Sequence, residues 1–192
     1  MPSWPNRRRL LDIFIVLISL TYPFLVYFGL MRFSAGAVGS VLLALLGARW
    51  LLSRNRTNRK PEAGLFLAVL ALMAALMLID ELLAIKAYPV MISLSMAGLF
   101  GYSLFSPPSI VERIARLKEP DLDAHGVRYT RNVTIVWILF FLINASISAW
   151  TALFASLEVW TFYNGFLSYI LIGSLFGVEF VIRQFVKQRK AS

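Results

Sequence analysis

Six stretches of this chain are apolar over about 20 residues, the length that a helix needs to cross a hydrocarbon core. A segment in lipid must satisfy its own backbone polar groups, so such a chain folds as an all-α membrane protein. We expect one compact bundle of six transmembrane helices, forming a single domain over residues 1–192. The predicted spans are approximately 10–29, 34–52, 64–83, 88–106, 133–156 and 159–182.

The Lys and Arg residues lie almost entirely on one side of this six-span arrangement. Of the 19, only Arg32 and Lys86 fall on the other side. Cytoplasmic loops carry such an excess, so we expect a bacterial inner-membrane protein with both termini in the cytoplasm. The opposite loops are very short, which predicts three antiparallel hairpins. The net charge of +9 then serves topology and contact with membrane lipids, and not nucleic-acid binding.

The cytoplasmic segment 107–132, between the fourth and fifth predicted helices, carries an ordering signal of its own. Ser109 followed by Glu112 is a capping box, and apolar residues after it recur on one helical face. This pattern predicts a short amphipathic helix along the inner leaflet. The segment is either a membrane-surface connector or a docking site for a cytosolic partner. The candidate docking residues are Arg113, Arg116, Asp121, Arg128 and Arg131.

Two groups of charged residues near helix ends are candidate functional positions. Asp80 and Glu81 at the outer end of the third helix, with Lys86 nearby, would share a proton or hold a cation. The alternative is a helix end solvated by water. Glu179 and Arg183 have the i, i+4 spacing of an ion pair near the end of the sixth helix.

Polar side chains also recur within the fifth and sixth predicted helices. Asn144 and Ser148 on one, and Asn164 and Ser168 on the other, would hydrogen bond between adjacent helices or line a groove for a headgroup or polyene tail. Small residues such as Gly173 and Gly177 recur at four-residue spacing, as in close helix packing within one bundle or between two copies. A homo-oligomer therefore stays open.

The chain lacks the residues that most enzyme and metal chemistries require. It has no cysteine and a single histidine, His125, which lies between Asp121 and Gly126 in a segment best read as a solvated loop. No phosphate-binding glycine loop and no nucleophile elbow is present. We expect no catalytic residue, no metal site and no cofactor, although enzymatic activity itself stays undecided.

Several strings together resemble a known family. They include Tyr22-Pro23, Tyr88-Pro89 and the runs FGYSLFSPPSIVERIARLKEPDL from Phe100, GVRYTRNVTIVWILFFLINASI from Gly126 and WTFYNGFLSYILIGSLFGVEFVIR from Trp160. These are similar to an uncharacterised family of proteobacterial inner-membrane proteins associated with aryl-polyene and β-ketoacyl synthase gene clusters. A more distant resemblance, carried by Trp137, Phe141, Asn144, Trp160 and Tyr163, is to the intracellular septation protein A family.

The resemblance implies a role in cell-envelope lipid biosynthesis and leaves three hypotheses. The first is an accessory or scaffold protein for acyl-chain or aryl-polyene-type synthesis, with cytosolic acyl-synthesis enzymes or acyl carrier protein as partners. The second is a small lipid or polyene transporter or flippase. The third is a membrane-bound transferase with a site near Arg113, Asp121, His125 and Arg128.

Overall fold

The computed structural model describes residues 23–41, 43–44 and 60–191. Positions 10–22 of the first predicted span, and positions 42 and 45–52 of the second, lie outside these residues. Residues 23–30 and 35–41 are helical, and a turn at 31–34 joins them where a short connection is predicted. All regular structure in the described ranges is helical, which confirms the α class.

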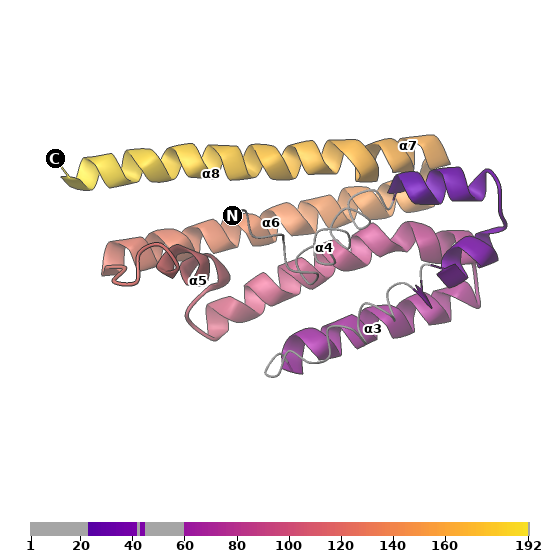
Figure 1. The fold of residues 1–192 in the computed structure, drawn as a ribbon, viewed down its shortest axis with the longest axis horizontal. Helices are drawn as coiled ribbons and strands as arrows, with labels where there is room; N and C mark the ends of the chain where they lie inside the picture. The colour runs from indigo at the N-terminus through magenta and orange to yellow at the C-terminus, as the bar shows by residue number, and fades with distance from the viewer. Residues whose placement is uncertain (1–22, 42, 45–59, 192) are drawn as a thin grey trace, which may run out of the picture. The chain divides into compact units, whose positions relative to one another are not determined.

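The remaining helices follow one another along the chain with short connections (Figure 1). They are α3 (Lys60–Met77), α4 (Glu81–Phe105), α5 (Ile110–Arg116), α6 (Ala124–Phe154), α7 (Leu157–Phe162), a π-helical turn η1 (Tyr163–Leu167) and α8 (Ser168–Ala191). Three stretches in the described part are long and apolar enough to cross a membrane: Glu81–Phe105, Ala124–Phe154 and Leu157–Val186. These stretches are what a membrane-embedded protein requires.

The boundary between the third and fourth helices differs from the prediction. Helix α3 ends at Met77 and α4 begins at Glu81, so residues 78–80 form the connection, and not 83–87. Asp80 caps α4, because its carboxylate accepts from the Leu83 N–H at 2.9 Å. Asp80 and Glu81 therefore start the fourth helix, where acidic groups meet the positive end of the helix dipole, and do not end the third. Apolar residues on both sides hide this boundary from hydropathy.

The segment 107–132 is also less of a loop than predicted. Helix α6 begins at Ala124 and not at 133, because the Asp123 carboxylate accepts from the Gly126 N–H at 2.9 Å and caps it. Arg128 and Arg131 lower the local hydropathy, but a helix continues readily from lipid into water. The final helix begins earlier and ends later than predicted. Ser156 caps α7, and α8 runs to Ala191.

The chain divides into two compact units, which are described one at a time. The first unit comprises Met1–Ala87 and Thr151–Phe166, and the second comprises Tyr88–Trp150 and Leu167–Ser192. In the first unit, Val26, Met73, Ile85 and Trp160 are fully buried. The core of this unit combines the end of α3, the start of α4, and α7. The single domain expected over residues 1–192 stays a prediction.

In the second unit, an aromatic cluster joins three helices. Trp137 of α6 contacts Phe100 of α4 with ring centroids 6.4 Å apart, and Phe176 of α8 at 4.5 Å. Phe140 and Phe141 complete the cluster around the same indole ring. Tilted and edge-to-face ring pairs add to dispersion packing, which holds helices together in lipid. This cluster fixes α6 against α4 and α8, and so positions the ends of these helices.

Candidate functional site

The charged residues near the start of α4 do not form a carboxylate pair that shares a cavity. Asp80 and Glu81 are both exposed, and Asp80 serves as the helix cap. Lys86 is instead 7% exposed, and its ammonium donates to the Ala155 carbonyl at 3.2 Å. Its own backbone carbonyl accepts from the Trp160 indole N–H at 3.1 Å. Lys86 thus ties the start of α4 to the connection between α6 and α7.

The two candidate asparagines lie in the interior and bind other parts of the protein. The Asn144 side-chain amide donates to the Ser93 hydroxyl at 2.9 Å, which links α6 to α4. Asn164 lies in the π-helical turn, and its side-chain amide donates to the Trp160 carbonyl of α7 at 2.9 Å and to the Thr151 hydroxyl of α6 at 3.3 Å. The Asn164–Thr151 bond joins the fifth and sixth predicted helices, as the spacing predicts, whereas the Asn144–Ser93 bond joins the fifth predicted helix to the fourth. Buried polar groups need such partners, so packing accounts for both amides.

The segment between α4 and α6, residues 106–123, is an ordered unit that we call the connector. Ser109 is buried and caps α5 by accepting from the Glu112 N–H at 3.3 Å, as its spacing predicts. The Glu112 carboxylate does not complete the capping box and pairs with Arg116 at 2.8 Å. The apolar face is split: Val111 is buried, whereas Ile114 and Leu117 are exposed.

Three of the candidate docking arginines bind backbone carbonyls of the same chain. Arg113 donates to the Pro108 and Ser106 carbonyls at 2.8 and 3.3 Å. Arg116 donates to the Pro120 carbonyl at 2.8 Å, and Arg131 to the Leu104 carbonyl at 3.1 Å. Helix ends leave carbonyls without intrahelical donors, and Arg113 and Arg131 supply donors around the end of α4, whereas Arg116 supplies one to the turn after α5.

Two of the candidate docking residues, Asp121 and Arg128, remain to be placed. Lys118, which is not among the candidates, is considered with them. Asp121, Arg128 and Lys118 are all exposed. They are the connector-region charges best placed to meet an outside molecule.

Glu179 and Arg183 form the ion pair that their spacing predicts, at 2.7 Å, and the Tyr129 hydroxyl donates to Glu179 at 3.4 Å. Tyr129 thereby joins α6 to α8.

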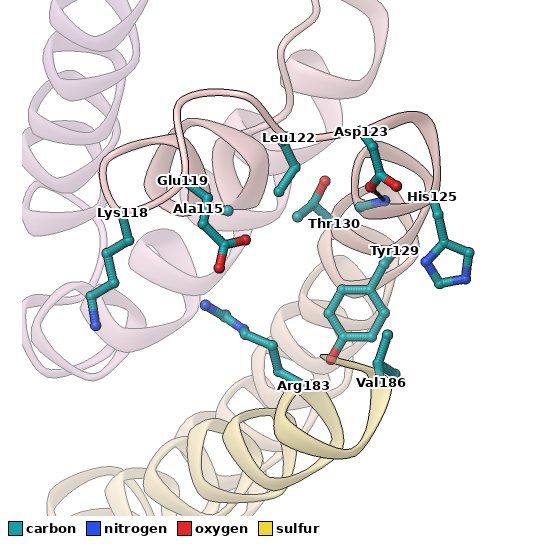
Figure 2. A pocket seen from close by; sticks show the side chains of 11 residues that line it. Ala115, Lys118, Glu119, Leu122, Asp123, His125, Tyr129, Thr130, Arg183 and Val186 are labelled. Carbon is teal, nitrogen blue, oxygen red and sulfur yellow. Dashed lines mark hydrogen bonds between the residues drawn. The ribbon is translucent and has the colours of Figure 1, made fainter. Parts of the chain in front are cut away.

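A cavity of about 260 Å³ opens beside the connector, within the second unit (Figure 2). Three elements supply its wall: the end of α5 with the following turn, the first turns of α6, and α8 near its end. Figure 2 shows Arg183 extending from α8 toward Glu119 of the connector, with the Tyr129 ring beside it. The lining residues are Ala115, Lys118, Glu119, Leu122, Asp123, His125, Gly126, Tyr129, Thr130, Arg183 and Val186.

This cavity gathers few of the residues that the sequence singled out. Arg183 and His125 line it, whereas Asp121, Arg128 and Arg113 of the transferase hypothesis do not. The sequence analysis did not identify four other lining residues as candidates: Lys118, Glu119, Tyr129 and Thr130. The signal that would have found the last two is helical spacing: once α6 starts at Ala124, residues 125, 126, 129 and 130 share one face.

The cavity has the chemistry of a binding site for a polar group with an apolar attachment. Two cationic and two carboxylate side chains lie in its wall, together with apolar Leu122 and Val186. Among the residues that the structure describes, no group of three His, Cys, Asp or Glu is arranged to hold a metal ion. Comparison of the chain with family models, curated proteins and solved structures finds no match.

Proposed function

We propose that this protein is an accessory protein of the bacterial inner membrane that holds cytosolic acyl-synthesis enzymes, or their acyl carrier protein, at the cytoplasmic surface. It would act in acyl-chain or aryl-polyene-type lipid synthesis, without catalysing a step itself. The proposal includes six transmembrane helices in three hairpins with both termini in the cytoplasm. The partition of Lys and Arg between the loops supports this orientation.

The observation that carries the proposal is the construction of the connector. Arg113, Arg116 and Arg131 hold the connector together, which leaves it as a shaped surface and not a loose loop. Lys118 of the connector and Arg128 near the start of α6 remain exposed. Preorganised surfaces bind partners at a lower entropic cost than flexible ones. A soluble partner with an acidic surface, such as a carrier protein, matches these exposed cations.

The test is affinity purification with crosslinking from native membranes, followed by mass spectrometry of the recovered proteins. Lys118→Glu with Arg128→Glu should lower the recovery of synthases or carrier protein by about tenfold or more, since each reversal of an interfacial charge costs on the order of 1 kcal/mol. Arg113 and Arg116 are poor choices for this test, because charge reversal there would disrupt the connector itself.

The control is Arg32→Glu, which reverses one charge at an exposed residue in the turn predicted to face the opposite side, and it is compared with Lys118→Glu and Arg128→Glu made singly as well as together. It should leave the recovery unchanged. Wild-type membranes that yield no synthase, carrier protein or exporter would refute the scaffold proposal. An equal loss of recovery with the control variant would show that the effect comes from overall charge and not from these two residues.

A further inference from the structure

The cavity beside the connector combines charges of both signs with an apolar wall. Lys118 and Arg183 contribute cations, and Glu119 and Asp123 contribute carboxylates, so the ionised lining residues balance to no net charge. Ala115, Leu122 and Val186 supply apolar surface between them. A site for a simple anion would instead carry an excess of positive charge. The balanced wall fits a ligand that itself carries both signs.

Exposed apolar side chains on α8 lie next to a lining residue of the cavity. Arg183 and Val186 belong to the apolar stretch Leu157–Val186, which is long enough to cross a membrane. One and two turns before Val186, on the same side of α8, lie Ile182 and Val178, which are 47% and 56% exposed. A molecule whose polar end occupies the cavity would lay its apolar part along these side chains.

We propose that this cavity binds the headgroup of a zwitterionic phospholipid whose ammonium carries N–H donors. Its phosphate would contact Lys118 and Arg183, and its ammonium would contact Glu119 and Asp123. A volume of about 260 Å³ lies just below the range of roughly 300–1,000 Å³ for pockets that enclose whole drug-sized ligands. It is therefore suited to a headgroup, with the acyl chains outside. This inference does not rest on the proposed scaffold function.

The local structure prepares the cationic side of the site. The Nε and Nη2 atoms of Arg183 donate to the Glu179 carboxylate at 2.9 and 2.7 Å, which holds the guanidinium in place. The Tyr129 hydroxyl donates to the same carboxylate and fixes it from α6. Holding the guanidinium in place before binding lowers the entropy lost when a phosphate arrives. Arginine is also the side chain whose planar donors best match phosphate oxygens.

The acidic side of the site selects between kinds of ammonium. Asp123 accepts from the Gly126 N–H, but an ionised carboxylate has room for several donors, so an ammonium can add to it. A trimethylated ammonium has no N–H to donate and is recognised by cages of aromatic rings. Tyr129 is the only Phe, Trp or Tyr among the lining residues, so no cage of such rings is present in this cavity. An ethanolamine headgroup therefore fits better than a choline headgroup.

The test uses the purified full-length chain in detergent, titrated separately with phosphatidylethanolamine, phosphatidylcholine and phosphatidylglycerol. The readouts are lipid adducts in native mass spectrometry and the thermal unfolding midpoint. The ethanolamine lipid should give a saturable adduct and raise the midpoint at the lowest concentration. Lys118→Ala should raise the concentration needed by about tenfold or more, the loss expected for one charge-assisted hydrogen bond.

The matched control is Arg128→Ala, which removes an exposed cation that does not line the cavity. Its titration should match that of the wild type. Equal stabilisation by the choline lipid, or stronger stabilisation by the glycerol lipid, would overturn the zwitterion proposal. Glycerophosphoethanolamine without acyl chains tests the source of the headgroup. If it saturates the site as well as the lipid does, the ligand is a soluble phosphoethanolamine compound and the lipid assignment is wrong.

Discussion

Single residues show how polar groups are accommodated inside apolar helices. Lys86 lies six residues into α4, yet it is buried and its ammonium donates to a main-chain carbonyl. An uncompensated charge within an apolar segment is costly, so the Ala155 carbonyl at the end of α6 stabilises it. That carbonyl belongs to the part of a helix that lacks an intrahelical donor. One contact therefore satisfies two groups that would each be expensive alone.

Two helical glycines, Gly126 and Gly173, differ in the space around them. A Cβ atom added at Gly126 would come within 2.7 Å of Leu122 Cγ, which is the branching atom of that side chain. A Cβ added at Gly173 would meet no atom within 4 Å beyond its chain neighbours and the backbone of its own helix. Both glycines lie in helices, where alanine is intrinsically favoured by roughly 0.5–1 kcal/mol. Steric contact is therefore what separates the two positions.

We expect Gly126→Ala to lower the free energy of unfolding by about 1–2 kcal/mol, because an overpacking cost of roughly 1–3 kcal/mol outweighs the helix propensity. Gly173→Ala should be neutral or raise it slightly. Thermal unfolding midpoints of both variants in the same detergent measure the difference. A stabilised Gly126→Ala would show that Leu122 does not lie over the start of α6.

At the scale of elements, the connector is held at both ends by side chains that satisfy backbone groups. Ser109 caps α5 and also accepts from the buried Thr134 hydroxyl of α6, at 3.2 Å. Arg131 of α6 donates to the Leu104 carbonyl near the end of α4. A helix of seven residues is too short to be stable by itself. Helix α5 therefore depends on these contacts with its neighbours.

We expect Ser109→Ala to loosen the connector, since loss of an N-cap costs about 0.5–2 kcal/mol and here also removes a buried acceptor. Amide hydrogen exchange over residues 110–120 should become faster by roughly tenfold. Ser146→Ala is the control, because Ser146 is exposed on α6 and donates only to its own helix, at Leu142. Unchanged exchange in Ser109→Ala would mean that the cap does not hold α5.

At the scale of the whole molecule, three apolar stretches in the described residues meet the length needed to cross a membrane. The count of six spans and the orientation stay predictions. The chain has no cysteine, so single introduced thiols report topology without background. Arg32 and Arg128 are both exposed, which makes them suitable positions.

With six spans, three helices separate position 32 from position 128, so the two must lie on opposite sides. We expect Arg32→Cys to react with a membrane-impermeant maleimide in intact spheroplasts. Arg128→Cys should react only after the membrane is opened, and solvent labelling of both after opening is the control. Labelling of both in intact spheroplasts would contradict the six-span topology.

Local interactions were accessible to the sequence, because their partners lie within four residues. The helical class, the apolar stretches, the Ser109 cap and the Glu179–Arg183 ion pair all depend on such short spacings. The start of α4 was misplaced by hydropathy, although Asp80 is itself a capping residue with a local signature. The same is true of Asp123 before α6.

The tertiary structure alone decided which distant groups meet. Lys86 and Ala155 are 69 positions apart, and Asn144 and Ser93 are 51 apart, so no local pattern pairs them. The cavity likewise needs the connector, the start of α6 and the end of α8 together. In lipid, helices associate through detailed packing and a few hydrogen bonds, and not through a periodic hydrophobic drive. Sequence periodicity therefore sets where the apolar helices lie, and only their packing makes the site.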